Sequence, residues 1–147
     1  MSRIRPVRAL VALAALLLSA VSFAAGPAVK TQAGYYRMML GAFEVTALSD
    51  GTVDLHVAQL LTNTTAQRVS QALAKAYLKD PVETSVNAYL VNTGSKLVLI
   101  DAGSGALFGP TLGKLAANLR AAGYQPEQVD EIYITHMHPD HVGGRTA

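Results

Sequence analysis

Three of the chain's four histidines lie in one stretch, Thr135–Gly144, together with an aspartate. His136 and His138 are two residues apart, so in an extended backbone their imidazoles point to the same side and can bind one cation. Asp140 and His141 are adjacent, so we expect their side chains to diverge and to bind a second ion beside the first. Imidazole and carboxylate are ligands for zinc and for similar first-row divalent metals. The pattern predicts a two-metal site, with Zn²⁺ as the expected ion.

Two other interpretations of this stretch are weaker. A polar turn that merely collects histidines would not need four ligand-type residues in this order at the end of a strand. A helical zinc-protease site needs histidines four residues apart around a glutamate, and Pro139 keeps His138 out of the α-helical region. A metal site is therefore the preferred hypothesis.

Two predicted strands lead to the residues of this site. Glu131–Thr135 is apolar and β-branched, which is typical of a short buried strand. Lys96–Ile100 is the more apolar strand of a predicted hairpin and is followed directly by Asp101 and glycines. Alone, Asp101 would be a turn residue that bonds to its own backbone. Beside the histidines, we expect its carboxylate to hydrogen-bond and orient the metal-binding loop.

The remaining sequence predicts a mixed α/β order without internal repeats. His56 lies outside any ligand pattern and is expected to be a surface or packing residue. Strands are expected at Tyr35–Leu40, Phe43–Leu48, Thr52–Leu55 and Ser85–Val91, a turn at Ser49–Gly51, and helices at Thr64–Leu78 and Pro110–Ala122.

The N-terminus has the pattern of a secretory signal peptide. Residues 1–24 contain a basic head, an apolar run from Ala9 to Val21 and a small-x-small end. The apolar run is short for a membrane span, and an uncleaved anchor is the alternative. We therefore expect the remainder, residues 25–147, to be exported to the periplasm or medium of a bacterium and to have no membrane partner after cleavage.

Charge and cysteine content limit the partners and ligands of the exported part. The whole chain has 12 Lys+Arg and 10 Asp+Glu, and the leader holds three of the basic residues and no acidic one. Nine basic and ten acidic residues remain, a net charge of −1, which gives no support for nucleic-acid binding. The chain has no cysteine, so neither disulfides nor thiolate ligands contribute.

The order His-x-His-x-Asp-His resembles the signature of the metallo-β-lactamase superfamily. Longer stretches resemble the amino-terminal half of the bacterial methyl parathion hydrolases within it. These stretches are Gly-Tyr-Tyr-Arg-Met from Gly34, Thr-Ala-Leu-Ser-Asp-Gly-Thr-Val from Thr46, Glu-Thr-Ser-Val from Glu83, Leu-Val-Asn-Thr-Gly-Ser-Lys-Leu-Val-Leu-Ile-Asp from Leu90 and Leu-Phe-Gly-Pro-Thr-Leu-Gly from Leu107.

The resemblance implies an αββα sandwich with a two-metal site at one edge, of which residues 25–147 would be the N-terminal half. His136 and His138 would bind the first metal, and Asp140 and His141 the second. Asp140 is the one ligand that we also assign to catalysis, and Asp101 matches the family's supporting aspartate. The family's further ligands, a histidine, a bridging aspartate and a last histidine, would lie beyond residue 147. The chain is thus expected to be truncated.

The implied activity is hydrolysis of phosphotriesters, small-molecule esters, by attack of a metal-bound hydroxide. Lactonase or other ester hydrolase activity on the same scaffold is an alternative. A third hypothesis is a non-catalytic fragment that binds metal weakly, and for the chain as given we expect no activity. A homodimer is compatible with the resemblance.

Overall fold

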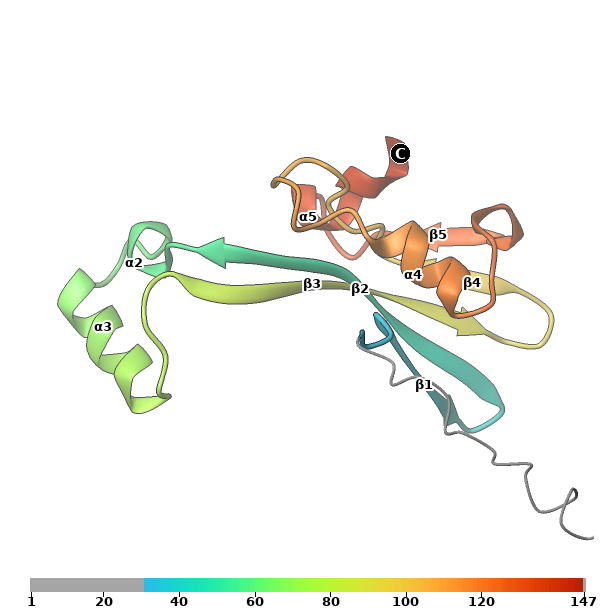
Figure 1. The fold of residues 1–147 in the computed structure, drawn as a ribbon, viewed down its shortest axis with the longest axis horizontal. Coiled ribbons are helices and arrows are strands. Elements are labelled where there is room, and N and C mark those ends of the chain that lie inside the picture. The colour runs from blue at the N-terminus through green and yellow to red at the C-terminus, as the bar shows by residue number, and fades with distance from the viewer. Residues whose placement is uncertain (1–30, 147) are drawn as a thin grey trace, which may run out of the picture. The chain divides into compact units, whose positions relative to one another are not determined.

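The computed structural model describes residues 31–146, so the predicted signal peptide at 1–24 lies outside the described residues. Five strands form one sheet, and their order in the sheet is their order in the chain (Figure 1). The first four strands are antiparallel, and the last runs parallel to its neighbour. The strands are β1 Tyr35–Leu40, β2 Phe43–Leu55, β3 Val82–Asn92, β4 Leu97–Ile100 and β5 Glu131–Tyr133.

β2 is one continuous strand, and the predicted turn at Ser49–Gly51 is wrong. The pairing with β3 shifts between Ser49 and Gly51, which marks a bulge in β2. Gly51 has φ +129°, and a Cβ there would lie 2.1 Å from the carbonyl oxygen of Thr111. The glycine thus serves a close backbone approach within a strand rather than a chain reversal. The bulge leaves Asp50 1% exposed.

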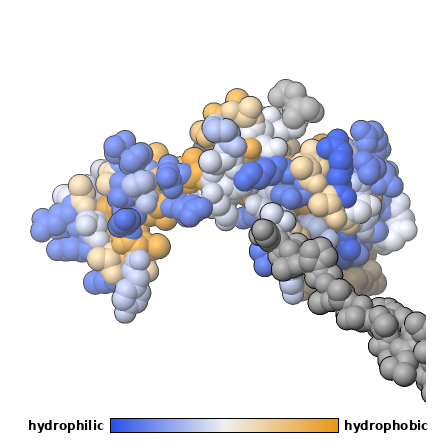
Figure 2. All heavy atoms as spheres, viewed as in Figure 1, coloured by the Kyte–Doolittle hydropathy of each residue, from blue (hydrophilic) through white to orange (hydrophobic). Residues whose placement is uncertain are grey.

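Two short helices, α2 Val57–Leu60 and α3 Ala66–Lys75, connect β2 to β3. The hydroxyl oxygen of Thr65 accepts a hydrogen bond from the N–H of Arg68, as expected of an N-cap residue. α3 is shorter at both ends than the predicted helix, although its one buried residue, Val69, is part of the predicted apolar stripe. Figure 2 shows hydrophobic residues gathered over the β2–β3 ribbon beside α2 and α3.

Helix α4, Leu115–Ala121, covers one face of the sheet and closes the core. The core consists of Leu48, Ala88, Leu90, Leu99, Leu119 and Ala122. Each buried leucine stabilises the fold by roughly 1.5–3 kcal/mol relative to an exposed one. The predicted helix begins too early, because Gly113 has φ +79°, which lies outside the helical region. The chain then passes through η1, Pro126–Gln128, into β5.

The opposite face of the sheet is apolar and open within residues 31–146. Tyr36, Met38 and Leu40 of β1 are 70%, 49% and 64% exposed. Their partners continue the same face across β2, since register partners in antiparallel strands share a face. Tyr89 and Tyr133 extend it toward β5. The chain is therefore an α/β layer pair with one covered and one uncovered sheet face.

The last elements are α5, Pro139–Val142, and η2, Gly143–Thr146. Across the part of the chain that the structure describes, no helix has both the length and the apolar character needed to span a membrane.

Candidate metal centre

The parallel pairing of β4 and β5 places the predicted site residues at one sheet edge. Ile100 is the register partner of Tyr133, so Asp101 and the segment after β5 leave the sheet side by side. The N–H of Asp101 continues the ladder and donates to the carbonyl oxygen of Tyr133 at 2.8 Å. The carboxylate of Asp101 and the histidine loop therefore meet where two neighbouring strands end. The prediction that the Glu131 strand is buried is wrong, since Ile132 and Tyr133 of β5 are exposed.

Asp101 binds the start and the end of the histidine loop. Its Oδ1 accepts a hydrogen bond from the N–H of Thr135 at 2.8 Å, and the Thr135 hydroxyl lies 2.9 Å from both carboxylate oxygens. Its Oδ2 lies 2.7 Å from Nδ1 of His141. The backbone of Asp101 has φ +61°, a conformation that few residues other than glycine adopt. These contacts are the ones expected of a carboxylate that orients the loop.

The hydrogen bonds also decide the protonation of Asp101. Burial raises the pKa of its carboxyl, because the charged form loses hydration. Hydrogen bonds from Thr135 and His141 stabilise the charged form, and they outweigh burial, so the pKa lies below its ordinary value. Asp101 therefore faces His141 as an acceptor, and His141 donates from Nδ1.

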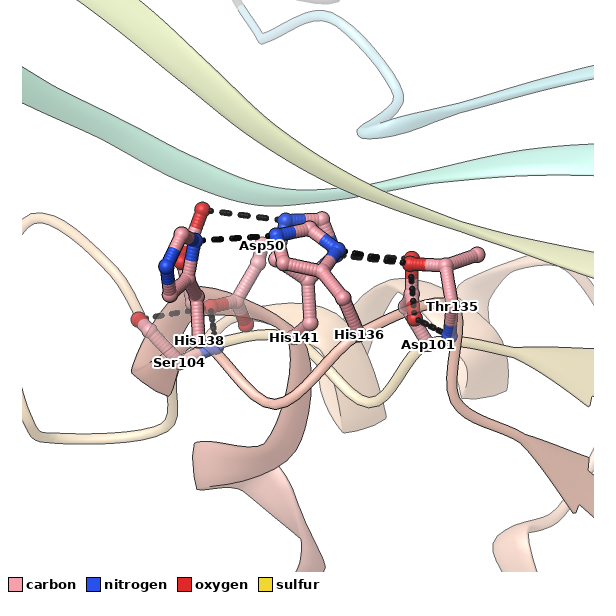
Figure 3. Close-up of polar contacts among 8 residues, drawn as sticks. Asp50, Asp101, Ser104, Thr135, His136, His138 and His141 are labelled. Carbon is pink, nitrogen blue, oxygen red and sulfur yellow. Dashed lines mark hydrogen bonds and ion pairs between the residues drawn. The ribbon is translucent and has the colours of Figure 1, made fainter.

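His136 and His138 lie against each other, as their spacing predicts. Nε2 of His136 and Nδ1 of His138 are 3.0 Å apart. His138 has φ −74° and ψ 151°, an extended conformation, and Pro139 begins α5 directly after it. Figure 3 shows both imidazoles with that of His141 at the same edge, beside Asp101 and Thr135.

The expectation that Asp140 and His141 diverge is wrong. Nε2 of His141 lies 3.2 Å from Oδ2 of Asp140, and the rings of His141 and His136 have centroids 4.0 Å apart. Two features explain the difference. The chain turns into α5 here instead of continuing as an extended strand, and Asp101 holds the His141 ring from its Nδ1 side. The two predicted ligand pairs are thus neighbours.

The donor atoms form two pairs, each with a spacing near that of two ligands on one divalent ion. Two nitrogen ligands on one tetrahedral zinc are about 3.3 Å apart, given Zn–N distances of about 2.0–2.1 Å. The 3.0 Å between His136 and His138 is close to that separation. His141 has Nδ1 on the Asp101 carboxylate, as metal-binding histidines usually do, and Nε2 beside Oδ2 of Asp140. No group of three or more His, Asp or Glu side chains able to hold one ion occurs within the described residues 31–146.

The glycines after the histidines allow the loop to pack directly on the chain after β4. A Cβ at Gly143 would lie 2.2 Å from the carbonyl oxygen of Ser104, and one at Gly144 would lie 1.9 Å from that of Ala102. The N–H of Ala102 donates to the carbonyl oxygen of His141 at 2.8 Å. Side chains at 143 and 144 would prevent this contact, which explains the Gly-Gly that follows the ligands.

Asp50 and Ser104 are two buried polar residues next to the loop that the sequence pattern did not single out. Both are buried, and the carboxylate of Asp50 accepts hydrogen bonds from the N–H and the hydroxyl of Ser104. A signal was present, since Asp50-Gly51 interrupts an alternating strand pattern, and a glycine in such a pattern indicates a bulge as well as a turn. His56 is exposed, as expected, and its Nδ1 lies 3.6 Å from Oδ2 of Asp80.

The chain is similar to known proteins in sequence and in fold. Residues 81–144 match the family described as the metallo-beta-lactamase superfamily. The crystal structure of hydrolase AbOPH in the beta lactamase superfamily is similar with a TM-score of 0.72 and 48% identity, over 78% of this chain and 40% of that one. AidC, a dizinc quorum-quenching lactonase solved with the product N-hexnoyl-L-homoserine, is similar with a TM-score of 0.70 and 28% identity, over 76% of this chain and 38% of that one.

A third solved structure shares the fold. It is a probable metal-dependent hydrolase from Staphylococcus aureus, with a TM-score of 0.58 and 22% identity, over 73% of this chain and 42% of that one. This chain thus spans about two fifths of the length of the structures that it matches.

Proposed function

The chain carries part of a metallo-beta-lactamase fold, and we propose that this part supplies half of the ligands of a two-metal hydrolytic site. One observation supports the proposal above the others. The Asp101 carboxylate holds Nδ1 of His141, while the His136 and His138 nitrogens lie 3.0 Å apart at the same edge. A cluster of unrelated surface histidines has no reason to carry a buried carboxylate behind it.

Each residue has a separate task in this proposal. His136 and His138 hold one ion through Nε2 and Nδ1, and Asp140 and His141 hold the second through Oδ2 and Nε2. Asp101 keeps the proton of His141 on Nδ1, so that the lone pair on Nε2 stays available. When bound, a pair of such ions polarises a phosphoryl or carbonyl oxygen and lowers the pKa of water toward about 7.

Asp140 has the additional role that we assign to catalysis. It is the one anionic ligand in the loop, so it offsets part of the charge of the second ion. Its Oδ2 lies 3.2 Å from Nε2 of His141, so the two donors of that ion are side by side. Without its charge, the second ion would be held by imidazole alone.

We propose phosphotriesters as the substrate class. The stretches that resemble methyl parathion hydrolases extend well beyond the histidine loop, and 48% identity to the hydrolase AbOPH supports a close relation to that protein. The alternative, a lactone, is favoured by the similarity to the lactonase AidC at 28% identity. Both are small-molecule esters, and both reactions use the same ligand pairs.

For the chain by itself we propose weak metal binding and no turnover. Stable zinc sites use three or four protein ligands on each ion, and the loop offers two to each. A non-catalytic chain is therefore the expected state of residues 25–147 alone. Activity is expected of a protein in which each ion has further ligands.

A zinc titration with two substrates tests these proposals. The purified chain is titrated with Zn²⁺ while hydrolysis of a chromogenic phosphotriester and of a lactone is followed. We expect weak binding and rates equal to those of zinc alone. A longer protein containing this segment should hydrolyse the phosphotriester faster than the lactone. Tight binding of two ions with turnover by the chain alone would contradict the account of an incomplete site, and a faster lactone reaction in the longer protein would favour the alternative.

We also propose export through residues 1–24, with cleavage near Ala24 or Ala25, because the basic head and apolar run have the signal-peptide pattern. Mass spectrometry of material secreted by a bacterial host should show a mature N-terminus near residue 25. Secreted protein that keeps residues 1–20 would contradict export by cleavage.

A further inference from the structure

Asp50 is a buried carboxyl group that contacts none of the metal-binding side chains. It lies at the bulge of β2 and is 1% exposed. Its Oδ2 accepts hydrogen bonds from the N–H of Ser104 at 2.9 Å and from the Ser104 hydroxyl at 3.1 Å. Its Oδ1 accepts from the N–H of Leu115, the first residue of α4, at 3.0 Å. Both oxygens are therefore engaged by backbone donors.

The segment that Asp50 holds is the one on which the histidine loop packs. On its far side, the N–H of Ala102 donates to the carbonyl oxygen of His141, and the carbonyl oxygen of Gly103 accepts from the N–H of Gly144 at 3.2 Å. The segment is also pressed against Asp50, since a Cβ at Gly103 would lie 2.7 Å from Cγ of Asp50. Figure 3 shows Asp50 beside Ser104 and apart from Asp101 and Thr135.

We propose that Asp50 is a positioning residue for the metal-binding loop and acts through residues 102–104. This inference rests on the proposed two-metal function. The carboxyl group fixes Ser104, which fixes the two backbone groups that hold the loop after His138. Asp101 orients the His141 ring, and Asp50 fixes the position of the backbone segment to which the His141 carbonyl group is hydrogen-bonded. The competing role is purely structural, as a link between β2 and the start of α4 through Leu115.

The substitution Asp50→Asn tests the positioning role with little change in volume. An asparagine has one acceptor oxygen and one NH₂ group, so in either orientation its NH₂ faces a backbone N–H, of Ser104 or of Leu115. A buried donor is then left without an acceptor. Ser104→Ala is the milder variant, since it removes the hydroxyl and keeps the N–H bond to Asp50. Thr46→Val is the matched control, because Thr46 is also fully buried on β2 and contacts Arg37 and Glu44 instead of residues 102–104.

The first measurement is amide hydrogen exchange of the metal-free chain. In Asp50→Asn, the amides of Ala102 and Gly144 should exchange roughly tenfold faster, while those of β1 keep the wild-type rate. Ser104→Ala should show a smaller change at the same two amides, and Thr46→Val none. Three results would overturn the inference. The amides of Ala102 and Gly144 could be unprotected in the wild type, their exchange rates could be unchanged in Asp50→Asn, or the rates could rise evenly over the whole sheet.

The second measurement is zinc affinity by competition with a chromophoric chelator. Asp50→Asn should weaken zinc binding on the order of 10-fold, the lower end of the effect of residues that support metal ligands. Thr46→Val should bind as the wild type does. If Asp50→Asn binds zinc normally while His136→Ala does not, the positioning role fails and the metal site stands. If His136→Ala also binds zinc normally, the proposed function fails. The exchange rates then decide only whether Asp50 fixes the loop backbone at Ala102 and Gly144.

Discussion

The histidine loop and the carboxylates beneath it differ in how they use their polar atoms. His136 and His138 are exposed, and Nε2 of His136 faces Nδ1 of His138. Asp50 and Asp101 are buried, and both oxygens of each carboxylate accept hydrogen bonds from backbone N–H groups or from neighbouring side chains. A residue that binds a metal must keep a lone pair available for the ion. A residue that orients such a ligand uses its lone pairs in hydrogen bonds to the protein. The comparison therefore supports the proposed division of these residues into ligands and supporting carboxylates.

The largest effect should come from the exposed pair. His136→Ala or His138→Ala removes one of the two donors to the first ion, and the remaining donor is a single imidazole. In a longer protein that holds two zinc ions, we expect one ion to be lost, as measured by metal content after equilibrium dialysis. In a longer active protein, most activity should go with it. Unchanged zinc content in both variants would show that these histidines are not ligands.

Asp140→Asn should be nearly as damaging, since it weakens a ligand and removes a negative charge while preserving shape. The second ion should be lost and the first retained, which is the reverse of the His136 result. Metal content of this variant in parallel with His138→Ala checks the assignment of two separate pairs. Loss of both ions in each variant would instead indicate one shared site.

Asp101→Ala should act on orientation and leave every proposed ligand in place. We expect zinc affinity to fall on the order of 10–100-fold, as for other residues that hold a metal-binding histidine. The exchange rate of the Thr135 amide should rise, because its acceptor Oδ1 is removed. An affinity loss as complete as that of His136→Ala would place Asp101 among the ligands, and no loss would remove it from the site.

The smallest effect is expected for His56, the histidine outside the loop. Its side chain is 56% exposed, and its contact with Asp80 is that of a surface pair, worth about 0–1 kcal/mol. His56→Ala should keep the zinc content and affinity of the wild type, so it is the histidine control for the other variants. Lower zinc content in His56→Ala would mean that the ligand set extends beyond the loop.

Much of the scaffold follows from local sequence patterns. β1 has the predicted bounds, and the hairpin of β3 and β4 and the approach of His136 to His138 follow from alternation and spacing. The errors arise where tertiary contacts override local preference. The residue types of Asp50-Gly51 are typical of a turn. The pair nevertheless lies in a strand, where the Asp50 carboxylate accepts hydrogen bonds from the N–H groups of Ser104 and Leu115.

The same limit applies within the site. Asp140 and His141 meet because Asp101, from a different strand, holds the His141 ring, and no local pattern contains that information. The α4 start is later than predicted because of the backbone conformation of Gly113, which its identity alone does not specify. Sequence spacing therefore identified the residues of the site, and only the fold shows what supports them.

The most direct test of the metal site is nitrogen NMR of the four imidazoles during zinc addition. We predict that Nε2 of His136, Nδ1 of His138 and Nε2 of His141 take on the shifts of metal-bound nitrogens. Nδ1 of His141 should stay protonated on Asp101, and both nitrogens of His56 should remain unchanged. Metal-bound shifts at His56, a metal on Nδ1 of His141, or no change at His136 and His138 would contradict the account.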